Sequence, residues 1–206
     1  MATLLQLVLD EADRTAALEV ARQLADLIDA VELGPRVLRV EGPTFVTAVR
    51  DTTPDRPVIC WVETEAQAET LIAVGVEGLT IPATLSDEVL SAIIARGQEA
   101  GRRLLLDLVD VSDPVSHETR FRKIKPDLLK VPVDANIRHV LTRLRLLEIP
   151  LGFSGQWSVA QVPWLLLYRP VALIAGSTVT AAPEPRRIAE GIRARMAVTP
   201  MMSGFY

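Results

Sequence analysis

The chain has 206 residues, of which 49% are hydrophobic and 23% are charged, and its formal net charge is −4. This composition is that of a globular core and excludes a disordered chain. The 22 basic residues are spread over the chain and are outnumbered by 26 acidic ones, so we expect one domain and no nucleic-acid partner.

Eight short apolar segments recur along the chain, each followed by a polar or glycine-bearing loop and then by a stretch with helical periodicity. Strands that alternate with helices predict a parallel sheet, and eight such units close it into a barrel. The predicted strands are 4–9, 28–33, 57–62, 78–81, 103–108, 127–133, 150–154 and 171–176. We therefore predict an α/β protein, a (β/α)8 TIM barrel over residues 1–197 with a C-terminal tail at 198–206.

The intervening segments are apolar on one side, as expected of helices that pack outside a barrel. Asp13 or Thr15 can cap the first helix, which runs to about residue 27. The other predicted helices are 44–50, 65–73, 87–100, 116–123, 137–147, 158–167 and 185–196.

No apolar run is long enough to cross a bilayer, and the first residues lack the basic segment of a secretion signal. We expect a cytoplasmic protein with no membrane partner. Cys60 is the only cysteine and lies inside a predicted strand, so it indicates packing rather than catalysis. His117 and His139 fall in predicted helices away from the strand ends, so a histidine-based metal site is not expected.

Function in such barrels is located on the loops after the carboxyl ends of the strands. Asp10 ends the first predicted strand and Glu32 lies near the end of the second. Two carboxylates that converge at the barrel mouth suit a divalent cation or general acid–base chemistry. The alternative is that each caps a following helix or pairs with an arginine such as Arg36.

Three further charged residues mark the ends or interiors of apolar strands. Glu63 shares a side of its strand with Trp61, and Asp107 and Lys130 lie inside the fifth and sixth predicted strands. If Lys130 faces inward, its amine is available for a Schiff base. Otherwise it points outward or is neutralised by Asp107, Asp134 or Glu63.

Small residues follow the last two strands, at Ser154 and Gly155 and at Gly176, Ser177 and Thr178. Loops seven and eight bind phosphate in many barrels, because small residues expose backbone N–H groups beside a helix N-terminus. These five residues are therefore candidates for binding a small anionic or phosphorylated substrate. Tight turns also need glycine, which leaves a purely structural interpretation open.

The segments 5–10, 28–34, 41–43, 73–77, 106–108 and 174–180 resemble the 3-keto-L-gulonate-6-phosphate decarboxylase and 3-hexulose-6-phosphate synthase family. That family lies within the orotidine-5'-monophosphate decarboxylase suprafamily, and the resemblance spans about residues 4–196. It implies that Asp10 belongs to the active-site carboxylate network, that Glu32 helps to hold Mg²⁺, and that the sugar phosphate rests near Gly155 and Gly176. It also implies a homodimer with sites near the subunit interface.

The chain departs from the family pattern at three places. The family's Asp-x-Lys-x-x-Asp after strand three is here Trp61-Val62-Glu63-Thr64-Glu65-Ala66. Pro132 aligns with the family's histidine at the end of strand six, and Ser177 replaces an arginine that would hold phosphate. Magnesium held by Glu32 alone would bind weakly, so we expect an altered reaction.

Residues 126–132 also resemble the sixth strand of class I aldolases, whose lysine forms a Schiff base. By that resemblance Lys130 is the nucleophile, with Glu63, Asp107 or Asp10 as proton carriers. Three hypotheses follow: a diverged carbon–carbon lyase, decarboxylase or aldolase-like, acting on a sugar-phosphate-like or other anionic molecule; a Schiff-base aldolase; and a barrel that binds or scaffolds without catalysing.

Overall fold

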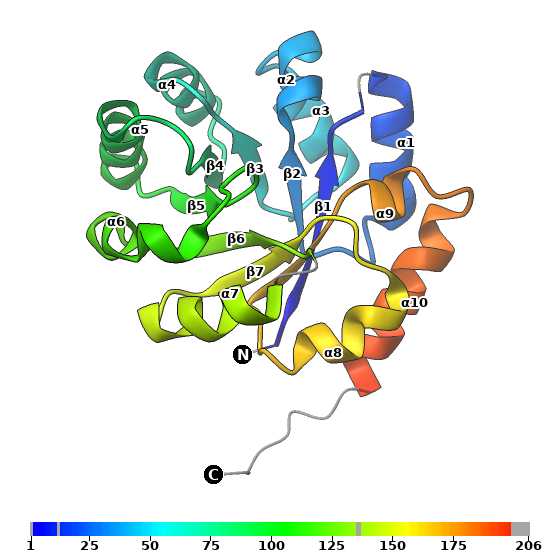
Figure 1. Ribbon diagram of the computed structural model, residues 1–206. Helices are drawn as coiled ribbons and strands as arrows, with labels where there is room; N and C mark the ends of the chain where they lie inside the picture. Colours follow the sequence, from blue (N-terminus) through cyan, green and yellow to red (C-terminus); the bar gives the residue numbers. More distant parts are fainter. Residues whose placement is uncertain (1, 12, 135–136, 199–206) are drawn as a thin grey trace.

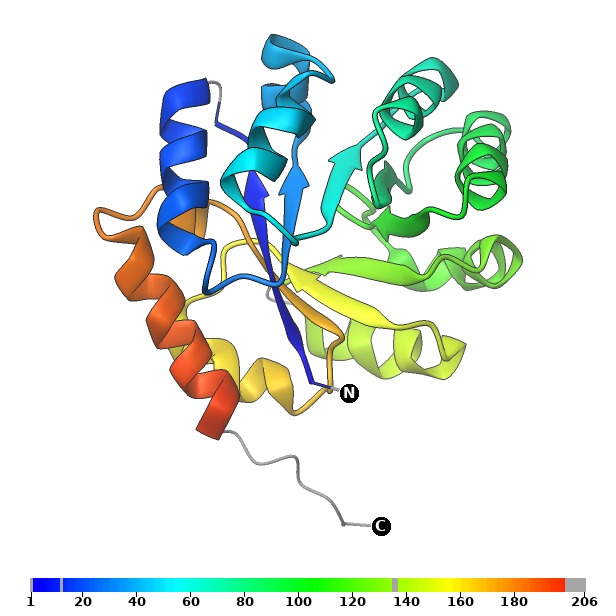
Figure 2. The same ribbon diagram turned by 180° about the vertical axis from the view of Figure 1, so that it is seen from behind.

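The structure is a computed structural model and describes residues 2–11, 13–134 and 137–198. Eight strands, all parallel, form a closed barrel in chain order. Figure 1 shows them at the centre of the molecule, and Figure 2 shows the same arrangement from behind. The strands are β1 (Leu4–Leu9), β2 (Ala30–Leu33), β3 (Val58–Trp61), β4 (Gly78–Pro82), β5 (Arg103–Asp107), β6 (Leu128–Pro132), β7 (Leu151–Ser154) and β8 (Ala172–Ala175).

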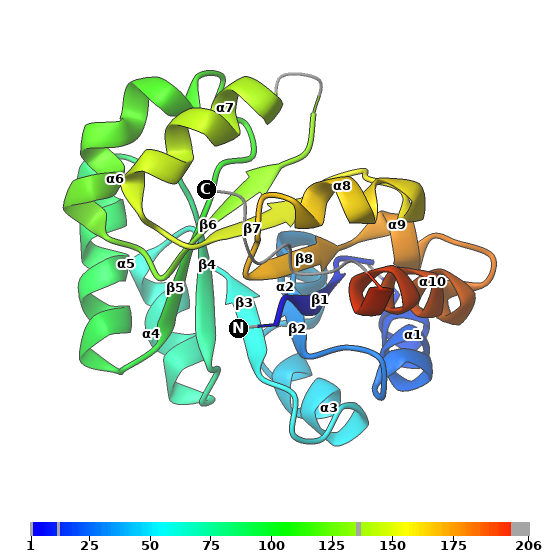
Figure 3. The ribbon, with the colours of Figure 1, turned by 90° about the horizontal axis from the view of Figure 1, so that it is seen from below.

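Helices form a ring outside the strands, which is clear from below in Figure 3. They are α1 (Arg14–Leu24), α2 (Pro35–Glu41), α3 (Phe45–Thr52), α4 (Glu65–Ala73), α5 (Asp87–Glu99), α6 (Glu118–Ile124), α7 (Ile137–Leu144), α8 (Val162–Leu166), α9 (Ser177–Thr180) and α10 (Pro185–Val198). Short 3-10 helices are η1 (Pro114–His117), η2 (Arg145–Leu147) and η3 (Val159–Gln161). The predicted (β/α)8 barrel is confirmed. Of the predicted tail, residues 199–206 lie outside the described residues.

Two helices were not predicted from the sequence, α2 and α9. Helix α2 starts directly after Gly34 with Pro35 at its first position. Proline is favoured at the first position of a helix, where its missing N–H costs nothing, so a signal was present. Helix α9 has only four residues, too few for an apolar periodicity.

The strand registers determine which side chains point into the barrel, because paired residues in neighbouring strands lie on the same face. Ile59 pairs with Gly78 and Leu105 with Leu128. The same face carries an apolar cluster of Ala30, Ile59, Leu105, Leu128, Ala172 and Ile174. It also carries the buried polar residues Gln6, Glu32, Thr80, Asp107, Lys130 and Ser154. Among the described residues, Thr53 is the one buried polar side chain outside the barrel interior.

Carboxylates at the opposite, N-terminal end of the strands have a structural role. Asp29, Glu77 and Asp127 each precede a strand and accept a hydrogen bond from a backbone N–H at the start of the preceding strand, at 2.7–2.8 Å. Arg193 and Arg50 in turn bind Asp29 and Glu77. These contacts hold neighbouring strands in register, so we assign these three carboxylates to the fold and not to chemistry.

Candidate functional site

A buried ionic cluster crosses the barrel interior. The ammonium of Lys130 on β6 lies 2.7 Å from Glu32 Oε1 on β2 and 2.9 Å from Asp107 Oδ2 on β5. Gln6 on β1 donates a 2.6 Å hydrogen bond to Glu32 Oε2. The side chains of Glu32 and Asp107 are 0% and 2% exposed, and that of Lys130 is 8% exposed. We call these four residues the buried cluster.

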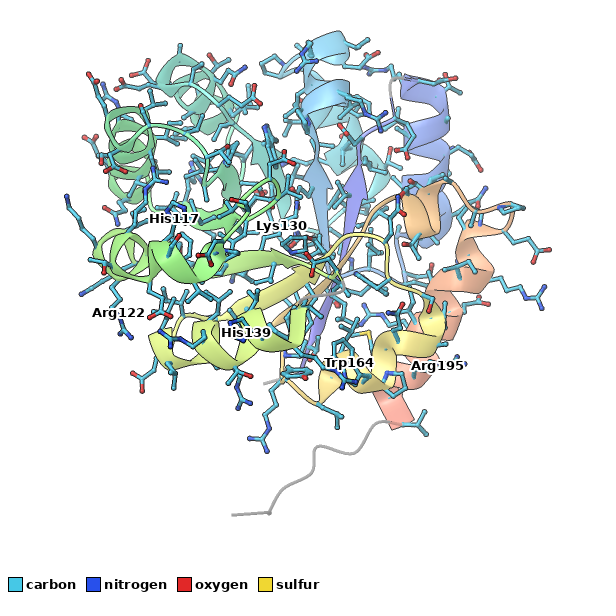
Figure 4. The ribbon with its side chains drawn as sticks, in the orientation of Figure 1. His117, Arg122, Lys130, His139, Trp164 and Arg195 are labelled. Carbon is cyan, nitrogen blue, oxygen red and sulfur yellow. The ribbon has the colours of Figure 1, made fainter. Side chains whose placement is uncertain are left out.

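The two carboxylates keep Lys130 charged. Burial by itself lowers the pKa of the Lys130 ammonium, but attraction to Glu32 and then to Asp107, with their hydrogen bonds, outweighs burial and raises the pKa above its ordinary value. An ammonium has three N–H donors, and the two carboxylates occupy two of them. One donor of Lys130 is therefore available to a ligand oxygen. Figure 4 shows Lys130 among the central strands, whereas His117 and His139 lie on the outer ring.

The raised pKa of Lys130 predicts how stability changes with pH. Because the folded-state pKa exceeds the unfolded value of about 10.4, the contribution is complete below that pH and is lost as pH rises through the folded-state pKa. We expect the free energy of unfolding of the wild type to fall above about pH 10.4 more steeply than that of a variant with Glu32→Gln, Asp107→Asn and Lys130→Met. Urea titrations between pH 7 and 11 measure this, and equal slopes for the two proteins would refute it.

Trp61 forms the wall of the buried cluster. Its ring lies over Lys130, with the ring centroid 5.7 Å from Nζ, a cation–π contact. The indole Nε1 donates to Glu63 Oε1 at 3.2 Å. The structure therefore places Glu63 on the far side of the indole, exposed to solvent, and the ion pairs of Lys130 are with Glu32 and Asp107. Of the partners considered for Lys130 from the sequence, Asp107 is observed, and Glu32 was not anticipated.

Two hydroxyl groups in the barrel interior have no hydrogen-bond partner within the described part of the chain. They are Thr80 Oγ1 on β4 and Ser154 Oγ on β7. Buried polar atoms are nearly always paired in native proteins. These hydroxyls, on the same barrel face as the buried cluster, are therefore available to a bound molecule. Neither Thr80 nor Gln6 was predicted as a site residue, although both are polar residues inside apolar strands, which is the signal that could have found them.

Asp10 makes a different set of contacts. Its carboxylate accepts hydrogen bonds from the backbone N–H of Arg36 at 2.7 Å and from the Arg36 guanidinium at 2.9 Å. It thus binds the first turn of α2, as in the alternative considered from the sequence. Gly34 makes this possible, because a Cβ there would lie 2.4 Å from Asp10 Oδ1.

The loops after β7 and β8 are neighbours, because these two strands pair. Gly155 has a φ of 97°, which favours glycine, and Gly176 precedes α9. Ser177 and Thr178 form the first turn of α9, where backbone N–H groups lack helical partners. Glu11 accepts a hydrogen bond from Thr180 of the same helix, so a carboxylate also lies at this loop.

The donor set around Glu32 does not fit a magnesium ion. One oxygen of Glu32 accepts from Gln6 and the other binds Lys130, so an ammonium occupies the place that a cation would take. Among the residues that the structure describes, no group of three His, Cys, Asp or Glu side chains is arranged to hold a metal. The structure thus gives no support to Glu32 as a magnesium ligand.

Comparisons with known proteins show what the chain is similar to. No family model matches the chain. A 3-hexulose-6-phosphate synthase from Mycobacterium gastri is 22% identical over 205 residues, covering 94% of this chain and 99% of the relative. A crystal structure of 3-hexulose-6-phosphate synthase superposes with a TM-score of 0.84 at 22% identity, covering 94% and 99% of the two chains. The 3-keto-L-gulonate-6-phosphate decarboxylase of Vibrio cholerae gives a TM-score of 0.83 at 16% identity, covering 96% and 98%.

The structural matches show the fold, and the sequence match extends over nearly the whole of both chains. The protein is thus a barrel related to lyases that are named for sugar phosphates. Its sequence is similar to that of 3-hexulose-6-phosphate synthase, and it shares the barrel fold of 3-keto-L-gulonate-6-phosphate decarboxylase and orotidine 5'-monophosphate decarboxylase. In the described residues, no helix combines the length and the apolar character needed to span a membrane.

Proposed function

We propose that this protein is a carbon–carbon lyase acting on a sugar-phosphate-like or other anionic molecule, with Lys130 as the cation that stabilises the reacting oxygen. The observation that carries the proposal is the position of Lys130, charged and held between Glu32 and Asp107 inside the barrel. In the family pattern a lysine follows strand three, where this chain has Glu63. Lys130 supplies a positive charge from strand six instead.

The chemistry of such a step is simple to state. When a carbon–carbon bond beside a carbonyl group breaks, its electron pair moves onto the carbonyl oxygen and gives an enediolate. The other fragment leaves as carbon dioxide when it is a carboxylate, or as an aldehyde when Asp107 accepts the proton of its hydroxyl group. A fixed ammonium stabilises the negative oxygen more than it stabilises the neutral carbonyl group. The activation free energy of bond cleavage is therefore lowered. A proton then returns to the carbon, and Asp107 is the proposed proton carrier, because Glu63 is separated from Lys130 by the Trp61 indole. Asp107 also positions Lys130, through their 2.9 Å contact.

The same geometry argues against the Schiff-base alternative. An imine needs a neutral amine, whereas the carboxylates of Glu32 and Asp107 raise the pKa of Lys130. We expect borohydride treatment in the presence of 3-hexulose 6-phosphate or 3-keto-L-gulonate 6-phosphate to leave the mass of Lys130 peptides unchanged. A reduced adduct on Lys130, detected by peptide mass spectrometry, would reinstate the imine mechanism.

Ser154, Gly155, Gly176, Ser177 and Thr178 remain the proposed hydrogen-bonding groups for the substrate's phosphate or hydroxyls. Their support is the pairing of β7 with β8 and the free hydroxyl of Ser154. Asp10 acts in this proposal as a support of the β1 loop and α2, not as a group in contact with substrate.

Two further proposals concern assembly and location. A homodimer is proposed from the resemblance, and sedimentation velocity measures it. A cytoplasmic location is proposed too.

The activity itself is tested by following 3-hexulose 6-phosphate and 3-keto-L-gulonate 6-phosphate by NMR with purified protein. Loss of the substrate signals with appearance of a shorter sugar phosphate is the expected result. A protein that binds these compounds and leaves them intact would instead be the non-catalytic barrel considered from the sequence.

A further inference from the structure

All four carboxylate oxygens of Glu32 and Asp107 already have an N–H partner. Glu32 Oε1 accepts from the ammonium of Lys130 at 2.7 Å, and Glu32 Oε2 accepts from the amide of Gln6 at 2.6 Å. Asp107 Oδ2 lies 2.9 Å from Lys130 Nζ, and Asp107 Oδ1 accepts from the backbone N–H of Val109 at 2.9 Å. A metal ion therefore reaches this pair of carboxylates only by displacing a hydrogen-bond donor.

The donor that stands in the way is the ammonium of Lys130. A magnesium ion shared by the two carboxylates would lie about 2.0–2.1 Å from an oxygen of each. Nζ already lies between those two oxygens at 2.7 and 2.9 Å, and the Trp61 ring covers it from a further side. Figure 4 shows Lys130 among the central strands. The ammonium and such an ion would occupy the same space, so each excludes the other.

The two carboxylates need a positive charge, whatever its source. The side chains of Glu32 and Asp107 are 0% and 2% exposed, so water does not solvate them. Buried charges in proteins are paired with an opposite charge or bound to a metal. Lys130 supplies the positive charge from β6. Because it is part of the chain, this charge does not depend on the concentration of a metal ion.

Two further carboxylates at the carboxyl ends of strands have other partners. Asp10 binds the backbone N–H and the guanidinium of Arg36, and Glu63 accepts from the indole of Trp61. Magnesium requires a near-octahedral set of oxygen ligands. In the part of the chain that the structure describes, no three His, Cys, Asp or Glu side chains come together in this way. The available oxygens are thus those of the two carboxylates that contact Lys130.

We propose that Lys130 is a built-in substitute for the divalent cation that the family resemblance implies. Cleavage then needs no metal ion, and Glu32 and Asp107 bind a divalent cation only after the ammonium has been removed. The inference rests on the proposed function for the reaction that the ammonium serves. Its statement about metal binding is independent of turnover and is tested separately.

The first experiment is a titration of chelator-treated protein with Mn²⁺, followed by the EPR signal of the free ion. Mn²⁺ prefers the same oxygen ligands as Mg²⁺. Three proteins are compared: the wild type, Lys130→Ala, and Lys130→Ala combined with Glu32→Gln and Asp107→Asn. We expect Lys130→Ala to bind one Mn²⁺ about tenfold or more tighter than either of the other two, and Mg²⁺ to displace it. Equal binding by the wild type and Lys130→Ala would overturn the inference.

The stability of the same proteins gives a second measurement, because Lys130→Ala leaves two buried carboxylates without a counter-charge. An ion that binds only the folded protein raises its stability. Mn²⁺ should therefore raise the urea midpoint of Lys130→Ala and leave the midpoints of the wild type and the triple variant unchanged. A wild-type midpoint that Mn²⁺ raises, and that Mn²⁺ no longer raises after Glu32→Gln, would overturn the inference even if Lys130→Ala does not fold.

The third measurement is cleavage of 3-hexulose 6-phosphate and 3-keto-L-gulonate 6-phosphate by the wild type, in EDTA and in Mg²⁺. The expected rates agree within about twofold, since the cation is supplied by the chain. Cleavage that requires Mg²⁺ would overturn the inference and leave the lyase activity standing. Absence of cleavage under both conditions would contradict the proposed lyase activity alone, because the Mn²⁺ measurements do not depend on turnover.

Discussion

Replacing Lys130 by methionine should destabilise the fold by about 3–5 kcal/mol, because it leaves Glu32 and Asp107 buried without a counter-charge. Both carboxylates are almost inaccessible to water, so neither can be solvated by a small movement. Urea unfolding followed by circular dichroism at pH 7 measures the change. A loss below about 1 kcal/mol would mean that the three side chains are not closely coupled.

The control for this result removes all the charges together. A protein with Glu32→Gln, Asp107→Asn and Lys130→Met has no buried charge to compensate, so it should be markedly more stable than the single Lys130→Met variant. Gln6 keeps an amide partner at position 32 in this protein. If the triple variant is as unstable as the single one, the loss in the free energy of unfolding comes from the packing of the lysine side chain and not from its charge.

The second large effect concerns catalysis. Asp107→Asn should lower kcat/KM for the sugar phosphate that the protein cleaves by about 10²–10⁴-fold, since Asp107 both positions Lys130 and is the proposed proton carrier. Lys130 keeps Glu32 as a partner, so we expect this variant to fold. Initial rates at several substrate concentrations separate kcat from KM, and a loss confined to KM would assign Asp107 to binding only.

Asp10→Asn is the matched control for Asp107→Asn. Asp10 is also a carboxylate at the end of a strand, but its bonds are to Arg36 on α2. The same change of charge there should alter kcat/KM less than fivefold, an effect of only about 1 kcal/mol. If Asp10→Asn is the more damaging of the two, the carboxylate network implied by the family resemblance lies at Asp10 and not in the buried cluster.

The sequence predicted the barrel well because its strands are buried on both faces and so read as short apolar runs. It also singled out Lys130, the one lysine inside such a run, with Asp107 as a possible partner. It could not show that Glu32 contacts Lys130, since these residues are 98 positions apart and meet only when β2 and β6 face each other across the closed barrel.

The orientation of Lys130 was likewise beyond the sequence. Alternation placed it on the face of Leu128 and Pro132, but the sequence does not say which face is the interior, and that is set by strand pairing around the barrel. A cavity between α2 and α4, lined by Arg39, Trp61 and Gln67 among others, was missed for a related reason. It depends on α2, which the sequence does not predict.

The central claim is that the ammonium of Lys130, held in the buried cluster, stabilises the negative oxygen that forms during carbon–carbon cleavage. Its most direct test is the turnover rate of the folded triple variant with Glu32→Gln, Asp107→Asn and Lys130→Met. Cleavage of 3-hexulose 6-phosphate and 3-keto-L-gulonate 6-phosphate would be compared with the wild type, after circular dichroism has shown the same fold. The expected result is cleavage by the wild type and none by the triple variant. A folded triple variant that cleaves at the rate of the wild type would contradict the account.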